Sequence, residues 1–339
     1  MHRLRQLSAH IPRKAFYTTA PPIVKMPKLL YPTSLALDPA LLQGYSVDLV
    51  PYDVKQPIPQ EHTDALVLVT WTNSAANLKD AAQRLTQLRW IQSLAAGPND
   101  VLAAGFSKDV VLTTGSGLHD HTVAEHTLAL LLAAARRLHD MRDSQLQGKW
   151  PGHLGGPQPD RPAGAFTSLQ GANVVVWGFG NIAKTLAPWL VALGARVSGV
   201  ARSRGVRDGI QVHATEDLKD VLPTADALVM ILPGDASTQN ALNAERLALL
   251  PKHAWVVNVG RGTSVDEDAL ADALEQGRVG GAALDVFATE PYPEGGRLWK
   301  TPNTIVSPHA AGGRPQNPEA LIAWNLRRFL AGQELKNVV

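Results

Sequence analysis

VVVWGFGNIA, residues 174–183, is the stretch that decides the fold. Its apolar start predicts a buried strand, and KTLAPWLVALG (184–194) after it predicts a helix. Between them lies G-x-G-x-x-A, in which Gly178 permits a tight turn and Gly180 lets backbone amides approach a pyrophosphate. The N-terminus of the helix would then face that anion. A glycine motif alone is a weak signal, but between a strand and a helix it predicts dinucleotide binding, with contacts from Gly178, Phe179, Gly180, Asn181 and Ile182.

The next predicted strand, within RVSGVARSRG (196–205), indicates which dinucleotide is bound. An enzyme that uses NAD normally ends this strand with Asp or Glu, which holds the ribose 2′-hydroxyl. Here Ala201 takes that place, and Arg202, Ser203 and Arg204 follow it. Two guanidiniums and a hydroxyl suit a 2′-phosphate, which a carboxylate would repel. We therefore predict NADP(H) as the preferred coenzyme and NAD as the alternative; the non-functional interpretation is a solvated surface loop.

Apolar runs alternate with helical patterns on both sides of this motif, which predicts βαβ units and parallel sheets. Because 339 residues exceed what one hydrophobic core usually supports, we predict two domains. The fold class is α/β with two Rossmann-like domains: a flavodoxin-like substrate domain (26–125 plus 311–339) and a doubly wound, parallel-sheet dinucleotide-binding domain (126–310). The predicted strands are KLLY (28–31), VDLV (47–50), ALVLV (65–69), WIQSL (90–94), VVL (110–112), NVVVWG (173–178), RVSGV (196–200), ALVMIL (227–232), WVVNVG (255–260), GAALDV (281–286) and TIVSP (304–308).

Two helical patterns lie near the predicted domain boundaries. HTVAEHTLALLLAAARRLHDM (121–141) predicts one long helix, and residues 148–168, rich in Gly and Pro, predict a loop that crosses between the domains. The last pattern, EALIAWNLRRFLAG (319–332), stands apart from the βα rhythm. It could complete the second domain or cross back to pack on the first.

Composition excludes several classes of protein. No window approaches the roughly 18 uncharged apolar residues that a membrane span needs, and the absence of cysteine excludes disulfides and thiol chemistry. Residues 1–37 hold six Lys or Arg and no acid, so the remainder is mildly acidic and no nucleic-acid face is implied. We interpret residues 1–25 as a candidate mitochondrial targeting segment, because they are Arg-rich, contain hydroxyls and lack acids. The alternatives are a disordered tail or a start codon placed too early, since MPKLLYPTS from Met26 resembles the beginning of a domain; the protein would then be cytoplasmic.

Three ionisable residues follow later strands: Arg261 in NVGRG, Glu290 in ALDVFATEP and His309 in SPHAAG. Ligands of open α/β sheets bind outside the carboxyl ends of the strands, so these side chains can converge on one site. Arg261 stands between Gly260 and Gly262, which suggests close approach of the backbone to a ligand, and the guanidinium suggests that the ligand is an anion. Each residue alone has a structural interpretation: a surface ion pair, a loop acid and a core histidine.

At these motifs the sequence resembles the D-isomer-specific 2-hydroxyacid dehydrogenases, and most closely their NADPH-dependent glyoxylate/hydroxypyruvate reductase branch. The resemblance runs from Met26 to the C-terminus and includes SLAAGPND (93–100) and VAEHTLALLL (123–132). It implies reduction of a small 2-keto acid to a D-2-hydroxy acid by hydride transfer from NAD(P)H. It also implies a homodimer and an active site in the cleft between the domains, which would close over the substrate.

The resemblance also implies a role for each site residue. Arg261 would bind the carboxylate and keto oxygen of the substrate, and His309 would protonate that oxygen as the hydride arrives. Glu290 would pair with His309 and favour its imidazolium form. The backbone amides of Ala96 and Gly97 would hold the substrate carboxylate. Further cofactor contacts would come from Leu232, Pro233, Val259 and Asp285, the last accepting a hydrogen bond from the nicotinamide carboxamide, and no metal is needed.

Two other functions remain as alternatives. A phosphoglycerate dehydrogenase tends to place basic residues near the substrate phosphate, but the corresponding loop VTWTNSA (69–75) contains neither Arg nor Lys. Some relatives are nucleotide-sensing corepressors instead of enzymes, and turnover of a 2-keto acid would separate the two classes. Three histidines, His119, His121 and His126, could compete for the role of proton donor, although capping or core burial explains each of them.

Overall fold

The structure is a computed structural model that describes residues 26–42, 44–157 and 165–339. The chain divides into two compact units. Unit 1 comprises the described residues up to Leu94 together with Asp100–Thr114 and Asn317–Val339, and unit 2 comprises Ala95–Asn99 and Gly115–Gln316. These divisions differ from the predicted boundaries at 125/126 and 310/311. The candidate targeting segment, residues 1–25, lies outside the described residues and stays a prediction.

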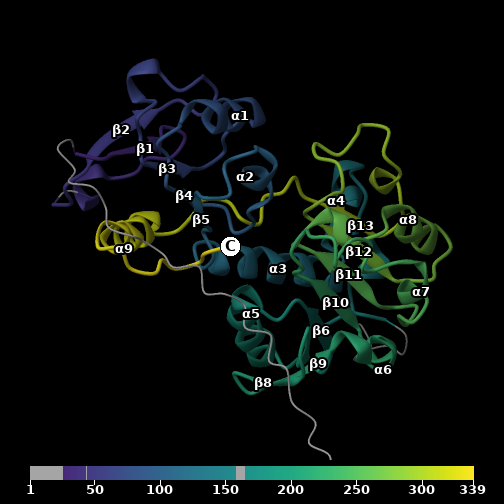
Figure 1. The fold of residues 1–339 in the computed structure, drawn as a ribbon. Coiled ribbons are helices and arrows are strands. Elements are labelled where there is room, and N and C mark those ends of the chain that lie inside the picture. The colour runs from purple at the N-terminus through teal and green to yellow at the C-terminus, as the bar shows by residue number, and fades with distance from the viewer. Residues whose placement is uncertain (1–25, 43, 158–164) are drawn as a thin grey trace, which may run out of the picture. The chain divides into compact units, whose positions relative to one another are not determined.

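Unit 1 is built on a five-stranded parallel sheet (Figure 1). Its strand order is β2-β1-β3-β4-β5, which is the flavodoxin order. Every residue of β3 and β4 is buried, as expected for central strands that are covered on both faces. The prediction of a flavodoxin-like sheet is therefore confirmed. The strands are β1 (Lys28–Pro32), β2 (Asp48–Tyr52), β3 (Val67–Thr70), β4 (Trp90–Ser93) and β5 (Val111–Thr113).

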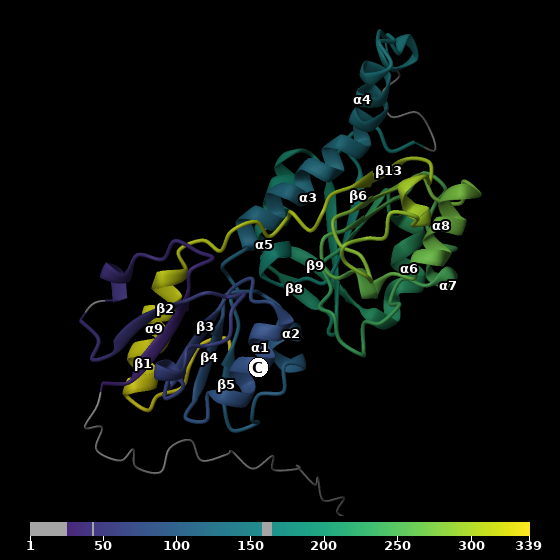
Figure 2. The same cartoon turned by 90° about the horizontal axis from the view of Figure 1, so that it is seen from above.

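The C-terminal helix α9 (Pro318–Leu330) packs on this first sheet, although more than 200 residues separate the two in sequence. Figure 2 shows it beside the strands of unit 1. The rings of Trp90 and Phe329 lie 5.4 Å apart, and the buried Asn325 donates to Gln92 at 2.8 Å. Of the two placements that the sequence left open for this helix, the structure selects the first unit. The remaining helical segments here are η1 (Pro39–Leu42), η2 (Gln60–His62), α1 (Ala75–Arg84) and α2 (Asn99–Ala103).

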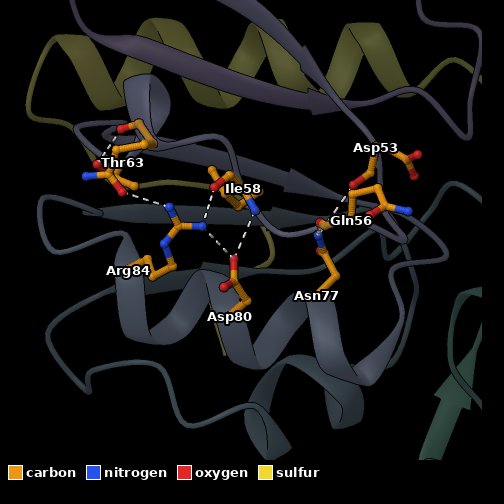
Figure 3. Close-up of polar contacts among 8 residues, drawn as sticks. Asp53, Gln56, Ile58, Thr63, Asn77, Asp80 and Arg84 are labelled. Atoms are coloured by element: carbon orange, nitrogen blue, oxygen red, sulfur yellow. Dashed lines mark hydrogen bonds and ion pairs between the residues drawn. The ribbon is translucent and has the colours of Figure 1, made fainter.

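Polar side chains of α1 fix the long loop that follows β2 (Figure 3). Asp80 accepts from the backbone N–H of Ile58 at 2.9 Å, and Arg84 donates to the carbonyl of Ile58 and to Gln60. Asn77, which is buried, donates to the carbonyl of Gln56 at 2.5 Å. Because buried backbone groups need partners, these side chains replace the ladder bonds that a loop lacks.

Unit 2 is built on an eight-stranded sheet with the order β13-β12-β11-β10-β6-β7-β9-β8. Its central part, read as β9-β7-β6-β10-β11-β12, has the strand order 3-2-1-4-5-6 of the doubly wound nucleotide-binding fold when β6 is counted as the first strand. Only β8 runs antiparallel. The strands are β6 (Asn173–Trp177), β7 (Arg196–Ala201), β8 (Gly205–Arg207), β9 (Ile210–Ala214), β10 (Ala227–Met230), β11 (Trp255–Asn258), β12 (Gly281–Leu284) and β13 (Thr304–Val306).

Alternate residues of β6 point into two separate cores, one on each face of the sheet. Val174 and Val176 belong to a cluster that also contains residues of α3 and α5, whereas Val175 and Trp177 belong to a cluster with residues of α6, α7 and α8. Burial on both faces explains why the sequence of β6 is a continuous apolar run. The helices are α3 (Asp120–Ala135), α4 (Leu138–Leu146), α5 (Asn181–Ala192), α6 (Leu218–Val221), α7 (Ala244–Leu247) and α8 (Glu267–Glu275), with short turns at η3 (Gly152–Leu154), η4 (Thr215–Asp217), η5 (Leu222–Thr224), η6 (Gly262–Ser264) and η7 (Arg297–Trp299).

Two features of unit 2 differ from the sequence prediction. The long helix predicted over 121–141 is broken, because Arg137 adopts a left-handed φ of 52° and donates to Asp140 at 2.6 Å, so that α4 starts anew. The hairpin of β8 and β9 was not predicted. Its turn consists of Asp208 and Gly209, both with positive φ, and Asp-Gly is the preferred pair for such a turn.

Within the described ranges, none of the helices is both long enough and apolar enough to cross a membrane.

Candidate active site

The turn after β6 brings its backbone against the end of a neighbouring strand. Gly178 has a φ of 102°, and a Cβ at this position would lie 2.4 Å from the carbonyl oxygen of Ile231. Glycine is therefore required both for the conformation and for the space. Gly180 is different: a Cβ there would meet no atom within 4 Å, and this residue directly precedes helix α5. The space beside Gly180 can therefore hold part of a bound molecule.

A cavity of about 290 Å³ adjoins this turn. It lies over the N-terminus of the 12-residue helix α5, where unpaired backbone N–H groups favour an anion. The turn therefore fits the pyrophosphate of a dinucleotide. Its lining comprises Gly178, Gly180, Asn181 and Ile182 from the predicted motif, and Ala96, which was predicted to bind the substrate carboxylate. It also includes three residues that the sequence interpretation missed, Ser116, Asp120 and Ile231.

The three missed residues differ in how easily the sequence could have revealed them. Ile231 precedes Leu232, which was predicted instead; the side chain of Leu232 is buried in the core. Both residues follow β10, and Ile231 packs partly against the core on the opposite face of the sheet from Leu232, so a shift by one residue exchanges a lining position for a core position. Ser116 and Asp120 lie before and at the start of α3 and carry no motif of their own. Burial of the Asp120 carboxyl raises its pKa, while the nearby His119 and His121 lower it.

Three other predicted cofactor residues support the site through the backbone or from its edge. The ring of Phe179 packs over Gly199, where a Cβ would lie 2.4 Å from a ring carbon. Val259 is buried in the same core and donates its backbone N–H to Met230 at 3.1 Å. Pro233 is exposed, and its carbonyl accepts from the hydroxyl of Thr238 at 2.6 Å. The side chains of Phe179 and Val259 therefore pack in the core beside the strand ends and do not line the cavity themselves.

The loop after β7 exposes Arg202, Ser203 and Arg204, as the coenzyme prediction requires. Arg204 is not isolated, however: its Nε donates to Oδ2 of Asp217 at 2.8 Å, and its Nη2 bonds to Oδ1 of the same carboxylate. Arg207, which the sequence interpretation missed, donates to the hydroxyl of Ser203 at 3.2 Å and to the carbonyl of Phe179 at 2.9 Å. It thereby ties this loop to the glycine turn.

Arg261 follows β11, and its side chain lies between two glycines. A Cβ on Gly97 would lie 2.3 Å from Nη2 of Arg261, and a Cβ on Gly234 would lie 3.0 Å from its Cγ. Asn99 donates to the carbonyl of Gly234 at 2.7 Å, and this hydrogen bond connects the segments that contain the two glycines. The predicted substrate residues Ala96 and Gly97 thus belong to the same compact unit as Arg261, not to the substrate domain where the sequence placed them.

The glycines beside Arg261 allow the backbone to pack closely against neighbouring segments. A Cβ on Gly260 would lie 2.6 Å from the backbone nitrogen of Leu232, and one on Gly262 would lie 1.8 Å from the carbonyl carbon of Phe287. The backbone thus closely approaches the neighbouring strand ends of the protein itself. The absent side chains of these two glycines let the ends of β10, β11 and β12 pack together, and their approach to a ligand stays a prediction.

His309 and Glu290 form a close pair. Nδ1 of His309 lies 2.6 Å from Oε2 of Glu290, and the other carboxylate oxygen accepts from the backbone N–H of Phe287 at 2.9 Å. His309 has a left-handed φ of 52° and donates its backbone N–H to Asp285 at 2.8 Å. A non-glycine residue in this conformation stores strain of order 1–3 kcal/mol and persists only where its surroundings fix it.

Asp285 holds the backbone around His309 in place. Its side chain is fully buried, and its carboxylate accepts from the backbone N–H groups of Ala310 and Ala311 at 2.8 and 2.9 Å. The hydroxyl of Ser307 donates to the same carboxylate at 2.5 Å, and His126 lies 2.9 Å from that hydroxyl. The side chain that was predicted to bind nicotinamide is therefore also the anchor of the His309 loop.

One series of contacts connects the three predicted catalytic residues. Gly262, next to Arg261, touches Phe287; Phe287 donates to Glu290; and Glu290 pairs with His309. The strands that precede them, β11, β12 and β13, are adjacent and parallel, so their carboxyl ends meet at one edge of the sheet. The arrangement brings a guanidinium, a carboxylate and an imidazole to the edge that also holds the dinucleotide cavity.

The competing histidines are engaged elsewhere. His119 is buried with Nδ1 3.0 Å from the carbonyl of Gly312, and His121 packs against Trp189 with ring centroids 5.6 Å apart. His126 belongs to the Asp285 network. In the part of the chain that the structure describes, no group of three or more His, Asp or Glu residues is arranged to hold a metal ion.

Comparison with known families finds one match in the region of this site. Residues 128–311 match the family described as "D-isomer specific 2-hydroxyacid dehydrogenase, NAD binding domain". A glyoxylate reductase of Aeropyrum pernix is 30% identical over 94% of this chain and 96% of its own length. A D-3-phosphoglycerate dehydrogenase of Methanocaldococcus jannaschii is 28% identical over 84% of this chain but only 53% of its own length. The chain thus spans about half the length of such phosphoglycerate dehydrogenases.

A solved structure extends the likeness to the whole fold. An NADPH-dependent glyoxylate/hydroxypyruvate reductase of Sinorhizobium meliloti, in complex with NADP and sulfate, has a TM-score of 0.75 at 25% identity. The superposition covers 93% of this chain and 98% of that one. Both units therefore have counterparts in a single protein.

Proposed function

The chain belongs to the D-isomer specific 2-hydroxyacid dehydrogenase family, and on this premise we propose that it reduces a small 2-keto acid to the D-2-hydroxy acid with NAD(P)H. The observation that carries the proposal is the His309–Glu290 pair, with 2.6 Å between Nδ1 and Oε2, at the same sheet edge as Arg261 and the dinucleotide cavity. A reduced nicotinamide bound at this edge supplies the hydride. The residues of the chain bind the substrate, orient it and supply the proton.

Arg261 binds the substrate in this proposal. Its guanidinium presents a planar fork of donors, which matches a carboxylate and a neighbouring keto oxygen. The positive charge polarises the carbonyl and stabilises the negative charge that develops on its oxygen. The backbone amides of Ala96 and Gly97 provide further donors for the carboxylate, since Gly97 lies directly against the guanidinium.

His309 moves the proton. Because Glu290 engages Nδ1, Nε2 is the nitrogen that faces the keto oxygen and donates a proton to it. In the reverse direction the same nitrogen accepts the proton from the hydroxyl group. The side chain of His309 is 47% exposed, so substrate and solvent can reach it from this side.

Gly97 offers a test of how closely Arg261 must be placed. A Gly97→Ala substitution puts a methyl group at 2.3 Å from Nη2, so the guanidinium must move. We expect kcat/KM for the keto acid to fall by about 10²-fold, because displacement of a catalytic group by about 1 Å has this cost. Coenzyme affinity, measured by fluorescence titration, should change little. The control is Gly295→Ala, where a Cβ would meet no atom within 4 Å. Equal kcat/KM for both variants would contradict the proposed position of Arg261.

NADPH is the preferred coenzyme in this proposal. Ala201 leaves the strand end without a carboxylate, and Arg202, Ser203 and Arg204 lie exposed beside it. The Sinorhizobium reductase, whose structure contains NADP, supports this choice. The substrate is proposed to be unphosphorylated, glyoxylate or hydroxypyruvate, because VTWTNSA (69–75) carries no cation and because glyoxylate reductases match along nearly their entire length.

A substrate panel tests the whole proposal. Initial rates with glyoxylate, hydroxypyruvate, pyruvate and phosphohydroxypyruvate, each with NADPH and NADH, should give the highest kcat/KM for one of the first two with NADPH. A preference for phosphohydroxypyruvate would instead favour a phosphoglycerate dehydrogenase, whose relatives match at 28% to 31% identity. Tight binding of NADPH without turnover of any keto acid would reject an enzyme and favour a nucleotide-sensing protein.

A further inference from the structure

The loop that is proposed to hold the 2′-phosphate contains a paired arginine. Arg204 meets Asp217 through two nitrogens, a forked arrangement that is the strongest form of this ion pair. The side chain of Arg204 is 69% exposed, whereas that of Asp217 is only 18% exposed. The acid is thus the fixed member of the pair, and the guanidinium is drawn toward it.

Several contacts hold the carboxylate of Asp217 in place. Its Oδ2 also accepts from the backbone N–H of Ala214 at 3.0 Å, at the point where β9 passes into η4. The hydrogen bonds from Arg204 and Ala214 lower the pKa of Asp217 to about 2. The carboxylate therefore remains charged above about pH 4, and the pair persists over the whole range in which a dehydrogenase is assayed.

The pair has two consequences for an incoming phosphate. It occupies Nε and Nη2 of Arg204, so fewer of the five guanidinium N–H groups remain for another anion. The negative charge of Asp217 also offsets the positive charge of Arg204, which weakens the attraction of the loop for a phosphate. Arg202 also has an acid nearby: the pKa of Asp235 is lowered mainly by hydrogen bonds from Ser237, and the charge of Arg202 adds to this.

The loop is also held by contacts that do not involve Asp217. Arg207 donates to both the hydroxyl and the carbonyl of Ser203, at 3.2 and 3.3 Å, and joins the loop to Phe179. Loss of the negative charge at Asp217 would release Arg204 while Arg207 continues to fix its neighbours.

We propose that Asp217 is a specificity-determining residue: its carboxylate holds Arg204 and weakens binding of the coenzyme 2′-phosphate, so that the preference for NADPH over NADH is smaller than the two arginines alone would give. The inference rests on the proposed use of NADPH. The inference assigns the size of the preference for NADPH over NADH to Asp217, which lies 13 positions after Arg204. This residue belongs neither to the glycine motif nor to the end of β7.

The test is direct binding of adenosine fragments to the full chain by isothermal titration calorimetry. Asp217→Asn keeps the size of the side chain but removes its charge. We expect it to tighten binding of 2′,5′-ADP by about fivefold, the scale of one screened charge interaction. Binding of 5′-AMP, which lacks the 2′-phosphate, should stay within about twofold. Because both fragments use the same domain, unchanged 5′-AMP affinity also shows that the variant is folded.

A matched control separates the pair from the general charge of the region. Asp208 lies in the turn of the neighbouring hairpin, is exposed, and pairs with Lys184 at 3.3 Å instead of with Arg204. Asp208→Asn removes the same charge, and we expect it to change 2′,5′-ADP affinity by less than about twofold. In Arg204→Gln the gain in 2′,5′-ADP affinity caused by Asp217→Asn should be smaller, because the competed guanidinium is gone and only the direct charge effect of Asp217 remains.

The outcomes distinguish this inference from the proposed function. Unchanged or weaker 2′,5′-ADP binding in Asp217→Asn overturns it, as does an equal gain in Asp208→Asn. If the unmodified protein binds 2′,5′-ADP no more tightly than 5′-AMP, the proposed NADPH preference fails. A gain in 2′,5′-ADP affinity in Asp217→Asn but not in Asp208→Asn would then still support competition for Arg204. Turnover of a keto acid enters none of these measurements.

Discussion

Replacing His309 with glutamine is expected to lower kcat for the keto acid by about 10²- to 10⁴-fold, the usual contribution of a general acid. Glutamine has a similar length and can still form hydrogen bonds, but it cannot release a proton at neutral pH. Initial rates at saturating substrate measure the loss. Fluorescence titration with NADPH measures coenzyme binding, which should change little, because the dinucleotide cavity is lined by residues of other segments.

The geometry around His309 explains why this residue should not be replaceable by another histidine. Asp285 fixes its loop through two backbone N–H groups, and Glu290 engages Nδ1. His121 is the matched control, since its ring packs against Trp189 and it lies outside the Glu290 pair. His121→Gln should keep most of the activity. If His309→Gln retained near-normal kcat while His121→Gln lost it, the proton donor would have to be reassigned.

Buried parallel strands account for most of what the sequence could predict. Each predicted strand is present, because runs such as VVVW and VLV are apolar on both faces and few other structures suit them. The β8–β9 hairpin was missed because GVR is short and mostly exposed, although the Asp208-Gly209 turn was a usable signal. The break after α3 depends on the φ of one arginine, which periodicity does not encode.

The candidate site could be predicted in part because the parallel strands that lead to it could be predicted. Residues that end predicted strands, such as Arg261, Glu290 and His309, must come to one edge of a parallel sheet, so their neighbourhood follows from topology. Their detailed partners do not. The contact of Gly262 with Phe287 and the fork between Arg204 and Asp217 depend on how loops pack, and no local pattern specifies that.

Replacing Arg261 is expected to have the largest effect of all, because the proposal gives this side chain two roles. Arg261→Met should lower kcat/KM by about 10⁴-fold: loss of one donor to a developing oxyanion costs about 10²–10³ in kcat, and loss of a charge partner weakens binding further. Methionine suits the site sterically, since the stem of Arg261 already packs on Gly234. Steady-state kinetics with glyoxylate or hydroxypyruvate would measure both roles through kcat and KM.

Arg261→Lys separates the charge of the side chain from its shape. Lysine keeps the positive charge but lacks the planar fork, so it can meet the carboxylate or the keto oxygen but not both with matched geometry. We therefore expect kcat/KM to order as Arg, then Lys at about 10²-fold lower, then Met. Arg196→Met is the control. Arg196 is the first residue of β7, so it lies at the amino ends of the strands and not at their carboxyl ends, and it donates to Asn173. If the Lys and Met variants were equally impaired, the charge of Arg261 would contribute nothing by itself. If neither were impaired, the guanidinium would be only a structural element between Gly97 and Gly234. In that case the keto acid would have to be held by another cation.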